Sequence, residues 1–426
     1  MKKISFYLMM LLVSFFTTAA LVSCGGDDDD PEDNPTGDGK RDSSVLDANA
    51  QKLKLESCAN ELMAKIKANE FQNIANIINS VRSKTDSNYE TNAVEDWFEA
   101  CSDACIISST SNNTKRLYRA SNYEGTFEYT NGKWVKTATN GTLTFRFYDT
   151  ANKFCELKAV TSGMEYKVYH DAFDSETYTY YPYYSTKYKE NAFMIPENIN
   201  VTLTQGGTEV ARATVHSVIS IANSSTGEVD FGRDNCEVTT TVKVNNYTFN
   251  VEKASFKGGS NAEGYVSAWL NKGSERLITL NGNINGNTTD EDNIKAGKLT
   301  FSVDALGKVR VGGTVASIDQ FRDAIDKADY NSGNETAYRS AITSANNQLN
   351  INVYFDGRST SDSYIKLEPN KIWSYYGSEE WDYDTVIYFS DGSGYNTIED
   401  FFDDVTFDNV INTFEDLIED FNNLID

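Results

Sequence analysis

The chain has 426 residues, of which 12% are aromatic, and it carries a formal net charge of −25 at neutral pH. From residue 379 onward it contains many acidic residues but no Lys or Arg. Nucleic acids and anionic lipid surfaces are bound through basic patches, so this balance argues against both, and we expect no nucleic-acid partner. The length is sufficient for one large domain or two ordinary ones.

The first 24 residues contain a basic start, a long apolar run and a cysteine. Lys2 and Lys3 precede an apolar run over residues 4–20, as in a signal peptide. An apolar run of about 17 residues is also the shortest membrane span, so its length alone leaves a retained helix open. The residues Leu21-Val22-Ser23-Cys24 resemble the bacterial lipobox, in which the cysteine is diacylated and becomes the new N-terminus. The resemblance implies that residues 1–23 are removed and that lipid on Cys24 makes the membrane a partner.

An acidic stretch follows the lipobox. Gly25 and Gly26 are followed by the run Asp27–Asp30, and no Lys or Arg occurs before Lys40. This arrangement resembles the acidic export tag of surface lipoproteins of the Bacteroidota. The resemblance implies an outer-membrane anchor that faces the cell exterior, with a periplasm-facing anchor as the alternative. Residues 24–43 are acidic and contain Gly and Pro, a composition typical of a flexible tether.

Residues 44–110 are predicted to be helical. Apolar residues recur there at intervals of three and four, in stripes over residues 55–66, 71–81 and 94–101. We expect three helices joined by short polar turns.

From about Leu117 the apolar period changes to two, and short predicted strands continue to about Val315. Asn131-Gly132, Asn140-Gly141 and Asn281-Gly282 are dipeptides typical of hairpin turns. Alternation with short turns favours an antiparallel sheet that is covered on one face.

Three further helices are predicted late in the chain. Ser317 and Gln320 form a capping box before a stripe that ends near Ala328, and a second stripe covers residues 337–345. Strands return at residues 350–355 and 386–389. From Phe407 the sequence is strongly amphipathic, but its polar side is acidic throughout, so we expect this helix to need docking against the sheet.

The predicted fold class is therefore α+β: a large antiparallel β-sheet with N-terminal helices, a late helical pair and a C-terminal amphipathic helix packed on it. Residues 111–426 are expected to form one continuous domain with residues 44–110. In architecture alone, this arrangement resembles the curved half-barrel with a helical lid of periplasmic lipoprotein carriers.

No motif indicates catalysis, so we expect no catalytic residue and a protein that is not an enzyme. His216 is followed by Ser217, but adjacent strand residues point to opposite faces, and no Gly-x-Ser-x-Gly elbow or phosphate-binding loop occurs. Cys101 and Cys105 lack two further partners for zinc. The Asn-rich and Asp-rich stretch 281–292 suits plain turns better than calcium. We expect no metal and no cofactor.

The sharpest functional signal is aromatic. Acidic residues and serine are interleaved with the five aromatic residues Trp373, Tyr375, Tyr376, Trp381 and Tyr383, and a second tyrosine cluster surrounds Pro182. Sugar rings stack on flat aromatic side chains, so the sequence predicts a glycan-binding platform at residues 373–383. The alternative is that these residues pack across a sheet face.

The leading hypothesis is a non-enzymatic, surface-anchored binding or adhesion lipoprotein with a glycan as ligand. The second is a carrier that encloses a small apolar ligand between its sheet and a helical lid. The third is a hydrolase that uses a pair of carboxylates.

Overall fold

The computed structural model describes residues 45–85, 101, 106–109, 113–139, 141–173, 177–178, 184–185, 188–221, 228–229, 233–289, 295–373, 379–402 and 405–425. Its helices are α2 Ala48–Lys65, η1 Ala68–Phe71, α3 Gln72–Thr85, η2 Ala120–Asn122, α5 Ile318–Tyr330, α6 Glu335–Asn346, α7 Ile398–Phe402 and α8 Val405–Ile425.

The strands before residue 230 are β1 Ile106–Ser109, β2 Asn113–Arg119, β3 Gly125–Thr130, β4 Lys133–Ala138, β5 Leu143–Tyr148, β6 Phe154–Phe173, β7 Thr177–Tyr178, β8 Tyr184–Ser185, β9 Tyr188–Gln205, β10 Thr208–Ser220 and β11 Glu228–Val229. The later strands are β12 Asn235–Val244, β13 Tyr247–Lys257, β14 Ala262–Lys272, β15 Glu275–Asn287, β16 Lys295–Ala305, β17 Val309–Val315, β18 Leu349–Phe355, β19 Ser363–Trp373, β20 Glu379–Phe389 and β21 Gly394–Thr397.

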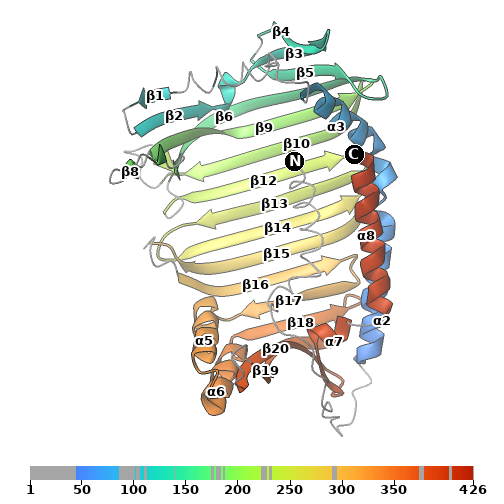
Figure 1. Ribbon diagram of the computed structural model, residues 1–426, viewed down its shortest axis with the longest axis vertical. Coiled ribbons are helices and arrows are strands. Elements are labelled where there is room, and N and C mark those ends of the chain that lie inside the picture. Colours follow the sequence, from blue (N-terminus) through green and yellow to red (C-terminus); the bar gives the residue numbers. More distant parts are fainter. Residues whose placement is uncertain are drawn as a thin grey trace.

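Among the described residues, nineteen strands form one sheet, and β7 and β8 pair separately. From β9 to β21 each strand except β11 pairs antiparallel with its neighbour in the sequence, so the sheet grows as a series of hairpins (Figure 1). The pairs β2–β9, β3–β5 and β6–β11 are parallel. The result is the predicted α+β architecture with a large, open and mostly antiparallel sheet.

The register separates an apolar face from a polar face. Cross-strand partners from β12 to β17 form the apolar row Val238, Ala254, Val266, Gly282, Phe301 and Gly313. The residues between them form polar rows on the opposite face, such as Ser255, Tyr265, Asn283, Thr300 and Thr314. We call these the inner face and the outer face of the sheet.

The described helices that pack on the sheet contact its inner face. Along one end of the strands, α2 packs on Val309 and Phe355, and α3 packs near Cys155 (Figure 1). At the other end, α5 and α6 pack on Leu367. The short helix α7 packs on Ile387 and Phe389. The helices thus form a rim around the inner face.

The late helical pair is confirmed, and so is its N-cap: the Ser317 hydroxyl accepts a hydrogen bond of 3.2 Å from the backbone N–H of Gln320. The terminal helix is also confirmed as α8. Its docking differs from the prediction, because it packs on α2, η1 and α3 rather than on the sheet. The rings of Phe71 and Phe421 lie 5.3 Å apart.

Two local predictions need correction, and one cannot be compared. The strand β1 begins at Ile106, inside the segment 44–110 that was predicted to be helical. The hairpin turn predicted at Asn281-Gly282 is wrong, because both residues lie within β15. The turn at Asn131-Gly132 is confirmed, with positive φ at both residues. The helix predicted over residues 94–101 lies outside the described residues except for Cys101.

Candidate functional site

The structure separates the residues of the predicted glycan platform. Trp373, at the end of β19, is 69% exposed. Trp381 and Tyr383, on β20, are half-buried and pack against Tyr338 of α6 and the surrounding core. Tyr375 and Tyr376 lie outside the described residues. The described residues of the predicted platform therefore do not share one exposed surface, because Trp381 and Tyr383 contribute to packing instead.

The contacts of Trp381 explain why it is buried. Its ring centroid lies 6.4 Å from that of Tyr338, and the Arg339 guanidinium lies 4.6 Å from the ring. The backbone N–H of Trp381 donates a hydrogen bond of 2.8 Å to the carbonyl oxygen of Ser332, in the turn between α5 and α6. The helical pair thus binds the edge of β20 and covers this indole.

Acidic side chains surround the same corner. The Tyr338 hydroxyl is buried and has no hydrogen-bond partner among the described residues, and its pKa is raised by burial and by the negative charges of Asp382 and Asp329. The pKa of Asp384 is raised by burial and by the charge of Asp382. A carboxyl group that protonates readily is one requirement of acid catalysis. A metal site is a separate question: the described residues contain no group of three or more His, Cys, Asp or Glu side chains that could hold a metal ion.

The inner face is a second candidate site, for which the sequence analysis named no residues. Where helices cover it, its side chains are almost fully buried: Leu367 is 5% exposed and Phe355 is 0% exposed. In the central strands, Val238, Val266 and Phe301 are only half-buried, and Phe249 is 38% exposed. A second structural layer normally buries such residues more completely. No described helix packs on this central area.

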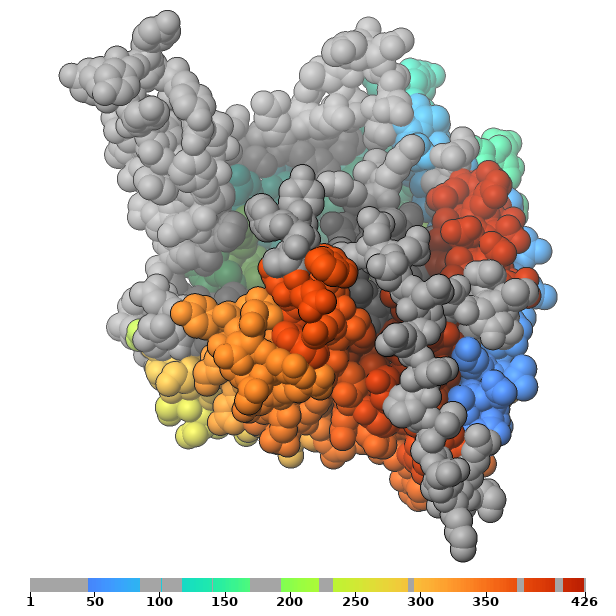
Figure 2. All heavy atoms as spheres, turned by 60° about the horizontal axis from the view of Figure 1, so that its bottom comes forward, coloured from blue at the N-terminus to red at the C-terminus, as the bar shows by residue number. Residues whose placement is uncertain are grey.

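The rim surrounds this area unevenly. Helices α2 and α8 run along one end of the strands, and α5 and α6 stand at the other end of the lower strands (Figure 1). Figure 2 shows the orange α5–α6 pair and the blue N-terminal helices on opposite sides of this end of the molecule. The central apolar rows of the described part therefore lie between helices that cover both ends of the strands.

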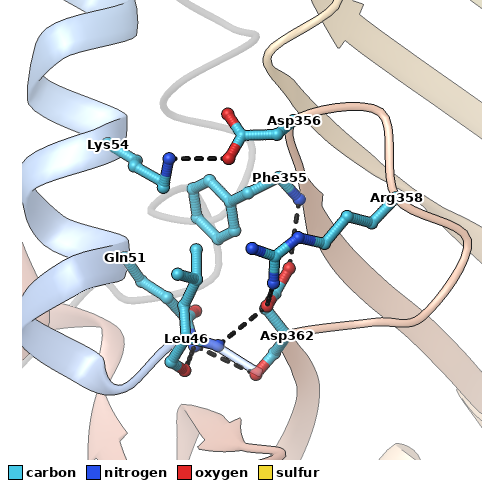
Figure 3. A network of polar contacts seen from close by, with 7 residues as sticks. All are labelled: Leu46, Gln51, Lys54, Phe355, Asp356, Arg358 and Asp362. Carbon is cyan, nitrogen blue, oxygen red and sulfur yellow. Dashed lines mark hydrogen bonds and ion pairs between the residues drawn. The ribbon is translucent and has the colours of Figure 1, made fainter. Parts of the chain in front are cut away.

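A buried polar network fixes the start of α2 to the sheet. The Asp362 carboxylate accepts hydrogen bonds from the backbone N–H groups of Leu46, at 2.9 Å, and Phe355, at 3.2 Å, and from Arg358 at 3.2 Å (Figure 3). Asp362 is 0% exposed. Its buried charge is thus compensated by three donors, as a buried carboxylate requires. The described chain enters the fold at this point.

Among the histidines and cysteines whose side chains the structure describes, none forms a nucleophile with an adjacent base. The His216 Nδ1 lies 2.8 Å from the Asn198 side-chain oxygen on the outer face, whereas Ser217 is buried on the inner face. Burial raises the pKa of the Cys58 and Cys155 thiols to about 11, so both are neutral near pH 7.

The sequence contained a usable signal for the inner face. Its rows follow from the alternation of apolar and polar residues in β12 to β16, which β-bulges interrupt in several strands. The sequence analysis used this alternation to predict strands and a sheet covered on one face, but it assigned no site to that face. Which part of that face stays free of helices depends on how α2 and α5 to α8 are placed, and no local pattern specifies that placement.

None of the helices within the described residues is long and apolar enough to cross a membrane. The chain matches no protein-family model, no curated protein and no solved structure.

Proposed function

We propose that the protein is a lipid-anchored binding lipoprotein of the outer membrane and that an apolar ligand, such as a lipid, occupies the central part of the inner face. The observation that carries the proposal is the row of half-buried apolar side chains between helices that cover both ends of the face. This is the carrier function that was the second hypothesis from sequence.

The energetics support a ligand at this position. Apolar surface that leaves water contributes about 25 cal/mol per Å², so an acyl chain that covers several of these side chains would gain several kcal/mol. Ligand pockets are also mostly apolar and concave. The rim is packed firmly on the strand ends: the Phe71–Tyr247 stack, with ring centroids 4.9 Å apart, lies where η1 meets them.

Mass spectrometry of the purified soluble domain under native conditions tests the proposal. We expect a bound lipid to co-purify with the parent protein and to be lost in Val266→Glu, which places a carboxylate in the central apolar row. Thr214→Glu is the matched control, because Thr214 pairs with Thr241 on the outer face. A parent protein free of bound lipid, which also fails to take up a fluorescent fatty acid, would contradict the proposal.

The anchor is a separate part of the proposal. Lipid on Cys24 would hold the chain without a spanning helix, because two or more acyl chains bind a membrane durably, at about 0.8 kcal/mol per buried methylene. Metabolic labelling with an alkyne fatty acid should mark the parent chain and leave Cys24→Ser unlabelled. Protease treatment of intact cells then distinguishes an outward-facing from a periplasm-facing anchor. Labelling that survives the substitution would exclude Cys24 as the lipidated residue.

A further inference from the structure

The outer face carries a row of asparagines that folding does not explain. The side chains of Asn281, Asn283 and Asn285 alternate along β15, and Asn283 and Asn285 are exposed. Asparagine is depleted in strands because its side chain competes for backbone hydrogen bonds and fits turns better. Three successive outward positions therefore oppose the local preference of the chain, which is typical of sites that serve another purpose.

The glycines of the same strand do have a packing reason. A Cβ atom on Gly282 would lie 3.0 Å from Val266 Cγ1, and one on Gly264 of the neighbouring strand would lie 2.8 Å from Ile284 Cγ2. These glycines let the apolar side chains of the inner face fit together. The asparagines have no such role: in the part of the chain that the structure describes, the side chains of Asn281 and Asn283 make no hydrogen bond, whereas Asn285 accepts one of 2.6 Å from the backbone N–H of Lys298.

Two aromatic side chains flank this row on β14. The indole N–H of Trp269 donates a hydrogen bond of 2.8 Å to Glu252, and the Arg276 guanidinium lies 4.3 Å from the Trp269 ring. These two contacts fix the orientation of the indole. Tyr265 lies four residues before Trp269 on the same strand and face, and it is 39% exposed. Its cross-strand partner on β15 is Asn283. The aromatic rings on β14 and the asparagine amides on β15 therefore lie side by side, at the spacing of neighbouring strands, about 4.8 Å.

The charge of this area differs from that of the rest of the chain. On the outer face of β14 to β16, the acids Glu263 and Asp304 are accompanied by the basic residues Arg276, Lys295 and Lys298. The remaining outward side chains there are hydroxyls, amides and the two aromatics. This nearly neutral patch, in a chain of −25, matches a ligand that is itself uncharged and rich in hydroxyl groups.

We infer that the outer face of β14 and β15 is a binding surface for an extended neutral glycan. The apolar faces of sugar rings stack on Trp269 and Tyr265, and sugar hydroxyls exchange hydrogen bonds with the amides of Asn281 and Asn283. The described helices pack on the inner face and leave this outer face uncovered, so it suits an extended chain of sugars rather than a single small molecule enclosed in a pocket. It lies on the opposite side of the sheet from the inner face and does not depend on the proposed carrier function.

Affinity electrophoresis of the full chain, in a neutral detergent without a sugar headgroup, tests this inference. The gels contain dextran, mannan, xylan or galactan as neutral probes, and polygalacturonate and alginate as acidic ones. We expect at least one neutral polysaccharide to retard the parent protein. The double variant Trp269→Ala/Tyr265→Ala and the variant Asn281→Ala/Asn283→Ala should each weaken binding at least tenfold.

Tyr330→Ala is the matched control, since it removes a more exposed aromatic ring, on α5 and outside the patch, and it should bind as the parent does. Val266→Glu, on the inner face, should also retain glycan binding, so failure of the carrier proposal can be told apart from failure of this one. Near-ultraviolet circular dichroism checks that each variant is folded. Retardation by acidic polysaccharides alone, no retardation by any probe, or unchanged binding in a folded Trp269/Tyr265 variant would each overturn the inference.

Discussion

The side-chain amide of Gln51 donates a hydrogen bond of 2.9 Å to the backbone carbonyl oxygen of Asp362, 311 residues further along the chain. The same amide donates to the carbonyl oxygen of Leu46 at 2.8 Å, and Gln51 is 1% exposed (Figure 3). The first turn of α2 is thus fastened to the loop between β18 and β19. This network holds the start of α2 on the sheet.

Replacing Asp362 with alanine should destabilise the fold strongly. The substitution leaves the buried N–H groups of Leu46 and Phe355 without acceptors, and each unsatisfied group costs about 1–3 kcal/mol, so we expect a loss of about 3 kcal/mol in the free energy of unfolding. Urea denaturation measures it. Asp356→Ala is the control, because its ion pair with Lys54, at 2.6 Å, is solvent-exposed and worth less than about 1 kcal/mol. Similar losses in both variants would contradict the buried network.

The two tryptophans of the predicted platform should differ in what they contribute to stability. Trp381 packs against Tyr338 and the α5–α6 core, so Trp381→Ala should lower the free energy of unfolding by about 2–3 kcal/mol, somewhat less than for a fully buried tryptophan. Trp373→Ala removes an exposed side chain and should change it by less than about 0.5 kcal/mol. Thermal unfolding followed by circular dichroism compares them. A stable Trp381→Ala protein would show that α6 does not depend on this contact.

Asp384 should make the corner near α7 sensitive to pH. Its pKa is raised by burial and then by the charges of Asp382, Asp400 and Glu399, so the folded state binds its proton more tightly than the unfolded chain does. The ionised carboxylate therefore costs stability above the folded-state pKa, and this cost disappears as the pH falls below the unfolded pKa of about 3.9. Asp384→Asn should raise the urea midpoint at pH 7, and the gain should shrink toward pH 4.

Asp323→Asn provides the comparison for that measurement, because Asp323 is an exposed acid on α5 and the variant changes the net charge equally. A gain of the same size in both variants would assign the effect to overall charge rather than to the surroundings of Asp384.

The thiols of Cys58 and Cys155 should be inert in the native protein. They are 2% and 0% exposed, and burial raises the pKa of each to about 11. The thiolate is the reactive form, so at pH 8 we expect iodoacetamide to leave both unmodified for hours and to alkylate both in denaturant. Peptide mass spectrometry identifies the modified positions. Rapid modification of Cys58 without denaturant would mean that α2 detaches from Val309 and Phe355 in solution.

Elements that depend on neighbouring residues were predictable from sequence, and those that depend on distant ones were not. The Ser317 cap and the stripe over residues 318–328 are local, and the structure confirms them. The packing of Trp381 depends on a helix pair some fifty residues earlier. The local sequence therefore could not distinguish an exposed platform from side chains packed against those helices. Asn281-Gly282 reads as a turn, but Gly282 is required by contact with Val266 on the adjacent strand.

The docking of α8 has a consequence for the order in which the protein can fold. Asn79 of α3 donates a hydrogen bond of 3.0 Å to the carbonyl oxygen of Leu424, and Phe71 contacts Phe421. The hairpins from β9 to β20 can form one after another as the chain is synthesised, because their partners are adjacent in sequence. The wall that α2, α3 and α8 make together cannot form in this way, because its members lie at opposite ends of the described chain. One end of the apolar face therefore stays uncovered until α8, at Val405–Ile425, has been made.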